Sequence, residues 1–304
     1  MNSREGFVIG VDVGTQSTRA GIFNLKGSML GYASEAISVY SPQSDFVEQS
    51  SNEIWEKTGL AIREALKETQ IRADEVVGIS FDATCSLVGL DKNHEPLTIS
   101  PTGDPWKNII VWMDHRALKE ADSINQTGHR VLEYVGGRIS PEQEPPKLKW
   151  IKDHLPETWT RAGKWMDLAD FMVFRATGKD MRSLCTNVCK WTYLGHETKN
   201  GSWDYTFFEK IGLSDLFDGG KVEKSAHPVG SFAGTLNGRS AHELGLQPGI
   251  AVGVGIIDAH AGGLGLLGDC AKLAFQNTNV WNMALALIGG TSSCHMVTSP
   301  DPRF

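Results

Sequence analysis

The hydrophobic pattern of the N-terminal third predicts strands before the first helix. Residues 7–12 form a short apolar run that is typical of a buried strand. Residues 19–25 and 29–37 predict two more strands, with tight turns at residues 14–18 and at Lys26-Gly27. Three short strands in succession indicate that the fold opens with a meander.

A long amphipathic helix is predicted after Ser50. Ser50 and Glu53 have the spacing of a capping box, in which each side chain accepts a hydrogen bond from the other residue's backbone N–H. Apolar and small residues then recur at the spacing of one helix face. These residues are Ile54, Thr58, Ala61, Ile62, Ala65 and Leu66.

Strands return after this helix. Residues 76–81 predict a buried strand that enters a polar turn at residues 82–86 and continues as strand beyond it. Residues 108–113 are another apolar run, which ends at Asp114. We interpret Asp114 as the N-cap of a helix that extends to about Asn125.

The second half divides into a helical middle and a strand-rich end. Residues 141–218 are rich in Trp and Pro, and predict helices and loops that form an insertion or cap on the first domain. Residues 249–257 predict a strand, residues 258–265 a small-residue turn into a helix, and residues 273–297 strands around a Gly-Thr turn. The order of elements predicts the α/β class, with a mixed sheet and flanking helices.

Length and composition fit a globular protein of two domains. The chain has 304 residues, of which 40% are apolar and 21% charged, and a domain has about 150 residues. There are 29 Lys and Arg against 36 Asp and Glu, which gives a formal charge of −7. An acidic chain without basic blocks is not expected to bind nucleic acid or an anionic membrane.

No targeting segment or membrane helix is expected. Glu5 and Asp12 interrupt the apolar core that a secretory signal needs. The longest apolar candidate, residues 281–290, is far shorter than the ~18 residues of a membrane helix. The five cysteines indicate reduced thiols in a cytoplasmic protein. Cys185 and Cys189 have a spacing that metal sites also use, but no second ligand pair follows, so we interpret them as small buried residues.

The first candidate for chemistry is the turn after the first strand. Asp12 ends this strand, and a turn rich in glycine and hydroxyl groups follows it. Backbone N–H groups and hydroxyls of such a turn can point at phosphate oxygens, and a carboxylate beside it can hold Mg²⁺ through water. The alternative is an ordinary hairpin with a structural aspartate. The turn residues concerned are Gly14, Thr15, Ser17, Thr18 and Arg19.

Two later segments complement this turn. Asp258 ends a predicted strand and precedes small residues, so it could accept a proton from a substrate hydroxyl during phosphoryl transfer. The alternative role for Asp258 is that of a helix N-cap. We interpret the neighbouring His260 as a packed side chain. Gly290 and Thr291 repeat the strand-then-Gly-Thr pattern of the first turn. Two such turns, with Asp258 between them, predict a nucleotide cleft between two domains.

Three more segments combine aromatic walls with hydrogen-bonding groups, as sugar sites do. One is the polar turn after the strand 76–81, one runs from Trp112 to Arg116, and one surrounds Lys190. For each, the alternative is a capped helix or a surface charge. The residues assigned to substrate are Ala83, Thr84, Cys85, Trp112, Asp114, His115, Arg116 and Lys190.

In combination, these residues resemble the FGGY carbohydrate kinases, a family with the actin-like ATPase (ribonuclease H-like) fold. The first phosphate loop of the family is similar to residues 12–19, its catalytic-aspartate motif to residues 255–265, and its second phosphate loop to residues 290–292. Within the family, residues 112–116 resemble the ribulokinase pattern, and residues 84–88 resemble the signature of the D-ribulokinase branch.

The resemblance implies a kinase that uses ATP and Mg²⁺ to phosphorylate a ketopentose, with D-ribulose ahead of L-ribulose and xylulose, and glycerol last. It implies that Asp258 is the base, that Asp12 organises the metal, and that Lys190 contacts the sugar. Residues 83–85 would line the ketose end, and the two Gly-Thr loops would hold the phosphates of ATP.

The same resemblance implies the domain organisation. Members of the family are much longer than 304 residues. Residues 6–256 would form the N-terminal sugar-binding domain, with the insertion at 141–218, and residues 257–304 would begin an incomplete nucleotide-binding domain. Residues 281–290 would then lack sheet partners and could pair with another copy of the chain, as a homo-oligomer.

A chain of this length is expected to have weak or no kinase activity by itself. Two other functions stay open. A catalytically silent sugar sensor would bind sugar without turnover. An actin-like or chaperone-type ATPase would hydrolyse ATP without sugar.

Overall fold

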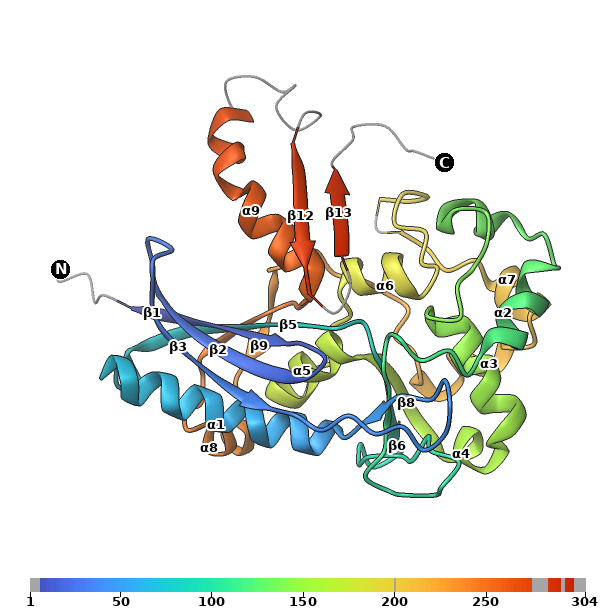
Figure 1. The fold of residues 1–304 in the computed structure, drawn as a ribbon, viewed down its shortest axis with the longest axis horizontal. Helices are drawn as coiled ribbons and strands as arrows, with labels where there is room; N and C mark the ends of the chain where they lie inside the picture. The colour runs from blue at the N-terminus through green and yellow to red at the C-terminus, as the bar shows by residue number, and fades with distance from the viewer. Residues whose placement is uncertain (1–5, 200, 275–283, 291–292, 298–304) are drawn as a thin grey trace.

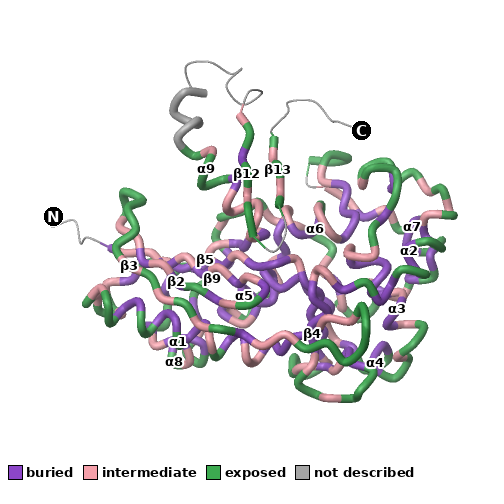
Figure 2. Tube along the Cα trace, in the orientation of Figure 1, coloured by how far each residue is buried: buried purple, intermediate pink, exposed green. Residues whose placement is uncertain are grey.

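The computed structural model describes residues 6–199, 201–274, 284–290 and 293–297. Figure 1 shows a layer of strands with α1 and α8 packed against one face, and a largely helical region beside it. The helix α9 and the strands β12 and β13 stand away from this body. In Figure 2 buried residues alternate with less buried ones along β1, β2 and β5, whereas the turns that join the elements are mostly exposed.

The main sheet opens with the predicted meander. It has seven strands in the order β3-β2-β1-β5-β10-β9, with β11 also paired to β5. The first three strands are antiparallel neighbours: β1 (Phe7–Val13), β2 (Ser17–Asn24) and β3 (Met29–Ala36). The mixed sheet with flanking helices that the sequence predicts is therefore confirmed.

Parallel strands form the centre of this sheet. β5 (Val76–Ala83) runs parallel to β1, to β10 (Ala251–Gly253) and to β11 (Ile256–Ile257). The antiparallel strand β9 (Phe232–Thr235) pairs with β10. Because parallel strands end at the same edge of a sheet, the residues that follow β1, β5 and β11 meet there.

The strand predicted at residues 249–257 is broken in two at Gly255. A Cβ atom at Gly255 would lie 3.1 Å from the carbonyl oxygen of Phe81 and 3.2 Å from that of Ala169. Only glycine therefore permits the chain to pass this close to β5 and to the helix that begins beside Ala169.

The predicted helix after Ser50 is confirmed as α1 (Ser51–Thr69), and the face with Ile54, Ala61 and Ile62 is buried. The Ser50 hydroxyl accepts the Glu53 N–H at 3.4 Å. The reciprocal half of the capping box was predicted wrongly. The Glu53 carboxylate instead accepts the backbone N–H and the hydroxyl of Ser38, at 3.0 and 2.7 Å, so it joins the helix to the segment after β3.

A second, smaller sheet supports the helical region. Its order is β4-β7-β6-β8, and its strands are β4 (Glu48–Gln49), β6 (Leu87–Asp91), β7 (Ile109–Ile110) and β8 (Ala162–Asp167). The predicted helical middle thus contains a strand, β8, and β8 leads into α5 (Leu168–Thr177). α5 packs on β5, β9 and β10, so residues 168–177 belong to the main body.

A group of helices surrounds a core that is rich in tryptophan. They are α2 (Leu118–Asn125), α3 (Glu144–His154), α4 (Pro156–Arg161), α6 (Leu184–Lys190) and α7 (Tyr205–Lys210). α8 (Gly238–Leu244) lies apart from this core and packs on α1 and α5. Short 3₁₀ turns lie at Ala73–Glu75, Arg130–Val135 and Ser214–Gly220. The tryptophans of this core are Trp150, Trp159, Trp165, Trp191 and Trp203.

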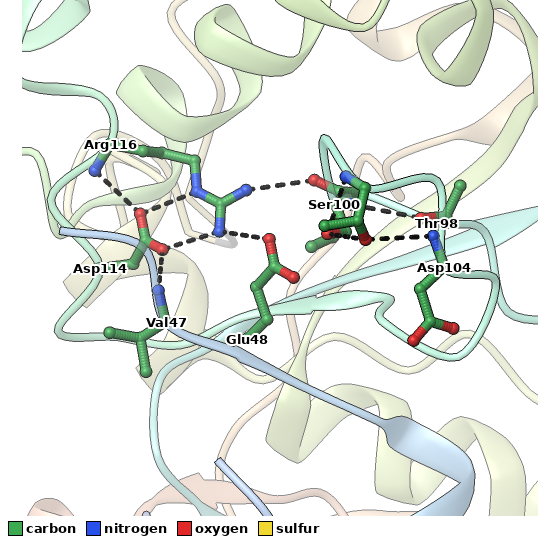
Figure 3. A network of polar contacts seen from close by, with 9 residues as sticks. Val47, Glu48, Thr98, Ser100, Asp104, Asp114 and Arg116 are labelled. Atoms are coloured by element: carbon green, nitrogen blue, oxygen red, sulfur yellow. Dashed lines mark hydrogen bonds and ion pairs between the residues drawn. The ribbon is translucent and has the colours of Figure 1, made fainter. Parts of the chain in front are cut away.

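The helix predicted to begin at Asp114 begins at Leu118 instead, with Ala117 as its N-cap. Asp114 is fully buried and accepts the Val47 N–H at 2.6 Å and two guanidinium N–H groups of Arg116 at 2.9 and 2.8 Å. Arg116 also donates to Glu48 at 2.9 Å (Figure 3). Asp114 is thus the anion of a buried ion-pair network, because Arg116 is a stronger partner than the end of a helix.

α9 (Asp258–Ala274) leads to a hairpin of β12 (Leu285–Gly289) and β13 (Ser293–Val297). A Cβ atom at Gly263 would lie 2.7 Å from the Met296 sulfur, so the small residues after Asp258 let the helix pack closely on the hairpin. Within the described residues, β12 pairs with β13 alone. Residues 281–283 of the predicted unpaired stretch lie outside the described residues.

Among the helices of the described residues, none combines the length and the apolar character needed to cross a membrane.

The buried ion-pair network gives a stability prediction. Arg116→Ala leaves the carboxylates of Asp114 and Glu48 buried without their cation, so it should lower the free energy of unfolding by about 3–5 kcal/mol. Urea denaturation of the 304-residue chain, followed by tryptophan fluorescence, measures this loss.

Arg138→Ala is the control, because the ion pair of Arg138 with Asp122 is largely exposed and should contribute little. Equal urea midpoints for the two variants would contradict the importance of the buried network.

Candidate functional site

Three aspartates meet at one edge of the main sheet. Asp12 lies near the end of β1, directly beside Asp82 of β5 in the parallel register. Ile256 of β11 is paired with Asp82 on its other side, and Asp258 follows β11 as the first residue of α9. Residues far apart in the sequence are therefore neighbours because the three strands are parallel and end together.

The carboxylates at this edge repel one another. Burial raises the pKa of Asp82 to about 9, and the negative charge of Asp12, a hydrogen bond with Asp12 and the charge of Asp258 add to this rise. Arg19 opposes it and forms an ion pair with Asp12 at 2.5 Å. Asp82 consequently carries a proton at neutral pH and donates it toward Asp12.

Asp258 stands where a strand becomes a helix. Its carboxylate accepts the N–H of Ala259 at 2.7 Å. The pKa of Asp258 lies above its usual range. Burial, the largest cause, and the charge of Asp12 raise it, whereas the Ala259 N–H and the charge of Lys190 lower it. An aspartate with a raised pKa is suited to accept a proton from a substrate hydroxyl.

The turn after β1 is held in place from three sides. The Gly14 N–H donates to the Ser17 carbonyl at 3.0 Å. The Thr15 hydroxyl accepts the Trp112 indole N–H at 3.1 Å, and the Gln49 amide donates to the Thr15 carbonyl at 2.8 Å. These contacts bring the predicted phosphate turn and the predicted sugar residue Trp112 together.

Thr18 is directed away from this turn. Its side chain is fully buried and hydrogen-bonded to the Thr58 hydroxyl of α1 at 3.1 Å. The physical reason is the alternation of side chains along β2, which points Thr18 under α1. Its hydroxyl thus contacts the protein core, contrary to its assignment to phosphate.

The turn after β5 joins the same region. The Thr84 N–H donates to the Val13 carbonyl at 2.9 Å, and the hydroxyls of Thr84 and Ser86 are 3.0 Å apart. Ser86 accepts the Trp112 N–H at 3.1 Å, and Ala83 is fully buried at the end of β5. The segments after β1 and β5 and the stretch at Trp112 are therefore one connected unit.

Lys190, at the end of α6, is the cation of this region. Burial lowers the pKa of Lys190, whereas the Glu144 carboxylate and a hydrogen bond with Cys85 raise it, and the net shift is upward. Lys190 therefore stays charged. Its charge also acts on the pKa of Asp258. Burial raises the pKa of the Cys85 thiol, so Cys85 is a neutral partner of Lys190.

The charged trio after Trp112 has partners within the protein. His115 is 3.1 Å from Glu142 and about half exposed, while Asp114 and Arg116 belong to the buried network of Figure 3. Contact of these three residues with a sugar stays a prediction.

The second Gly-Thr turn is only partly described. Gly290 follows β12 and is exposed, while Thr291 lies outside the described residues. β12 itself contacts α9, the helix that begins at Asp258. The meeting of the two phosphate turns thus also stays a prediction.

The edge of the sheet has the donors that Mg²⁺ prefers. Within the described part of the chain, no group of three or more His, Cys, Asp or Glu is arranged to hold a metal alone. Mg²⁺ is usually held by one or two carboxylates together with water and substrate phosphates. Asp12 and its neighbours Asp82 and Asp258 fit that use, and a cation there would relieve their mutual repulsion.

Asp82 is absent from the residues assigned from sequence. The sequence does contain a signal, because Asp82 ends an apolar strand in the same way as Asp12 and Asp258. The parallel pairing that places it between them is visible only in the structure.

Comparison with known proteins identifies relatives of this chain. Residues 7–265 match the N-terminal domain of the FGGY family of carbohydrate kinases. The chain is 42% identical to an FGGY carbohydrate kinase domain-containing protein of Xenopus laevis, over 99% of this chain and 54% of that protein. It is 39% identical to a D-ribulokinase of Saccharomyces cerevisiae, over 98% of this chain and 45% of that protein.

A solved structure shows the same fold at low sequence identity. The xylulose kinase of Rhodospirillum rubrum superposes with a TM-score of 0.73 at 20% identity, over 85% of this chain and 50% of that one. The fold is thus that of the actin-like ATPases, as the sequence predicts. The chain spans about half the length of the curated relatives that it matches. It belongs to the FGGY family of carbohydrate kinases and matches the N-terminal domain of that family over residues 7–265.

Proposed function

We propose that this chain is the sugar-binding part of an ATP-dependent kinase that converts D-ribulose to D-ribulose 5-phosphate. One observation carries the proposal: Asp12, Asp82 and Asp258 gather at the end of three parallel strands, beside a hydroxyl-rich turn and the Lys190 ammonium. Such an edge combines a proton acceptor with groups for a metal and phosphates, which phosphoryl transfer requires.

The choice of ribulose has its own support. The yeast relative at 39% identity bears the name D-ribulokinase. Lys190, Cys85 and Trp112 lie around the same edge of the sheet, and offer a cation, a neutral thiol and an aromatic wall to a small polyol. L-ribulose and xylulose are the next candidates, because the same side chains could bind them.

Asp258 would perform the proton transfer. Its carboxylate accepts the proton of the primary hydroxyl at C5 of the sugar as that oxygen bonds to the γ-phosphorus, and the bond from this phosphorus to the bridging oxygen of ADP breaks. Asp258 is fixed at the start of α9 by the Ala259 N–H. A positioned base of this kind contributes about 10²–10⁴-fold to rate.

The turn after β1 would hold phosphate oxygens. Thr15 and Ser17 would supply hydroxyl donors, Gly14 would let a phosphate approach the backbone closely, and Arg19 adds a cation beside Asp12. Gly290 and Thr291 would hold the phosphates from the opposite side. Mg²⁺, bound with ATP near Asp12, would offset the negative charge of the phosphates and of the carboxylates.

A silent sugar-binding protein is the second candidate function, and a titration separates it from the kinase. Isothermal titration calorimetry of the 304-residue chain with D-ribulose measures binding. A coupled ADP-release assay of the complete gene product, with pentuloses and polyols as acceptors, measures turnover. Sugar binding without ADP release from any acceptor would favour the silent protein, and ATP turnover without sugar would favour an ATPase that acts on other partners.

The base gives a prediction about turnover. Asp258→Ala in the complete gene product should lower kcat about 10²–10⁴-fold, because the attacking hydroxyl loses its proton acceptor. Sugar affinity measured by calorimetry should stay within about threefold, since a base contributes mainly in the transition state.

Asp122→Asn serves as the control, because this carboxylate lies on the surface, 68% exposed, away from the three strands. Near-normal turnover of the Asp258→Ala protein would remove Asp258 from the mechanism.

Asp82 gives a prediction about pH. Its pKa of about 9 in the folded chain exceeds the usual value, so the folded state holds a proton that the unfolded state releases. The stability that Asp82 contributes therefore falls as pH rises from about 4 toward 9. Asp82→Asn should remove this loss and raise the free energy of unfolding at pH 8 by at least about 1 kcal/mol.

Urea denaturation at pH 5 and pH 8 measures the effect. The difference between the two proteins should be smaller at pH 5 than at pH 8, because the unfolded chain releases the Asp82 proton more readily as pH rises while the folded chain keeps it. Mg²⁺ should narrow the difference at pH 8 if it binds at these carboxylates. A difference of the same size at both pH values would show that the folded and unfolded chains do not differ in the protonation of Asp82.

A further inference from the structure

A second group of polar side chains is buried between α3 and α6 without hydrogen-bond partners. Glu144 and Lys147 are both fully buried and form an ion pair 3.6 Å long, which exceeds hydrogen-bonding distance. Asn187 is 1% exposed. Within the described residues, five side-chain atoms of these residues have no hydrogen-bond partner. They are the two carboxylate oxygens of Glu144, the Lys147 nitrogen, and the oxygen and nitrogen of the Asn187 amide. We call these three residues the inner polar cluster.

The inner polar cluster adjoins the site already described. The Gln143 amide donates to the Cys189 carbonyl at 3.2 Å, so the start of α3 meets the end of α6. Asn187 precedes Lys190 by one helical turn, which places both on the same side of α6. The charge of Lys190 acts on Glu144 as well as on Asp258. Lys190 therefore lies near both Asp258 and the cluster.

Unpartnered polar groups at this depth need an explanation. Buried polar side chains nearly always have hydrogen-bond partners, because otherwise the fold has lost their hydration without compensation. Glu144 and Lys147 have only their long ion pair with each other, and the Asn187 amide has no hydrogen-bond partner among the described residues. These groups, on two adjacent helices next to a proposed ligand site, indicate partners that are not part of the protein. The two candidates are ordered water and the substrate.

We propose that the inner polar cluster binds the end of the open-chain ketose remote from Asp258, the C1 hydroxyl and the C2 carbonyl, and so determines which sugar is accepted. This inference rests on the proposed kinase function. If the C5 hydroxyl meets Asp258, the carbonyl end extends past Lys190 toward α3.

The chemistry of each group suits this end of the sugar. Lys147 can only donate and matches the carbonyl oxygen, an ionised Glu144 can only accept and matches the C1 hydroxyl, and the Asn187 amide does both. Burial raises the pKa of Glu144 to about 7, although Lys147 and Lys190 lower it. A site built from such buried groups rejects an analogue that lacks the matching hydroxyl, because its own groups are then left unpaired.

The test uses Asn187→Leu in the 304-residue chain. Leucine has a similar size and removes two unpartnered polar atoms, so the melting temperature should rise by about 2 °C or more. Affinity for D-ribulose, measured by calorimetry, should fall at least tenfold. The unchanged chain should also bind D-ribulose at least tenfold more tightly than 1-deoxy-D-ribulose, and the variant should have lost most of this preference.

Asn125→Leu is the matched control. The Asn125 side chain bonds the backbone of Ile139 through both its nitrogen and its oxygen, at 3.1 and 2.7 Å. Its replacement should lower the melting temperature and leave the affinity for D-ribulose unchanged. A stabilised Asn187→Leu chain that loses sugar affinity therefore separates a binding role from a structural one.

A double variant covers the case in which Asn187→Leu does not fold. Glu144→Gln with Lys147→Met removes both buried charges together, which a fold usually tolerates, and the affinity for D-ribulose should again fall at least tenfold. If both variants bind D-ribulose as the unchanged chain does, the cluster holds ordered water and the inference is overturned while the kinase proposal stands. If the unchanged chain binds no pentulose, both proposals fail.

Discussion

The pairing of β5 with β1 on one side and β11 on the other is the constraint on which the site depends. It aligns Asp12 with Asp82 and places Asp258 one strand further along. A shift of the register by one residue would turn each of these side chains to the opposite face of the sheet. The chemistry of the site is therefore set by backbone hydrogen bonds, and the glycine at position 255 permits the close approach that β11 requires.

Charge is distributed unevenly around this edge. Burial, together with the neighbouring carboxylates of Asp12 and Asp258, raises the pKa of Asp82, and Arg19 offsets this rise only in part. Lys190 lowers the pKa of Asp258 in the same way. The buried Arg116, by contrast, is matched by two carboxylates and by backbone groups. A matched network supports the fold, whereas an unmatched one is suited to a metal ion or a reacting group. This difference separates Asp114 and Arg116 from the three aspartates of the sheet edge.

The segment between β7 and α8 holds both a part of the main body and the helices of the inner polar cluster. α5 packs on the main sheet and β8 on the smaller one, while α3 and α6 meet near Lys190. The proposed sugar site thus has a rigid floor, made by the sheet, and a wall, made by two helices with unpartnered polar groups. In this proposal, recognition of the sugar by the two helices is separate from proton transfer at Asp258.

The sequence by itself determined much of this protein. The meander, the helix after Ser50, the strand at 76–81 and the α/β class all follow from periodicity and from turn residues, because these depend on neighbours along the chain. The order of the motifs also predicted the family. Asp12 and Asp258 are conspicuous in the sequence because each follows an apolar strand, and Lys190 because it lies among aromatic residues, while their roles follow from the resemblance to the family.

The tertiary structure decided the rest. Asp114 looked like a helix cap, but it is the partner of Arg116, whose approach depends on the path of β4 and β7. Thr18 looked like part of the turn, but the strand points it under α1. Contacts with residues distant in sequence are what single out Asp82, Glu144, Lys147 and Asn187. Local patterns report the backbone state of a segment, whereas burial, pairing and charge depend on which segments meet, and only the folded chain determines that.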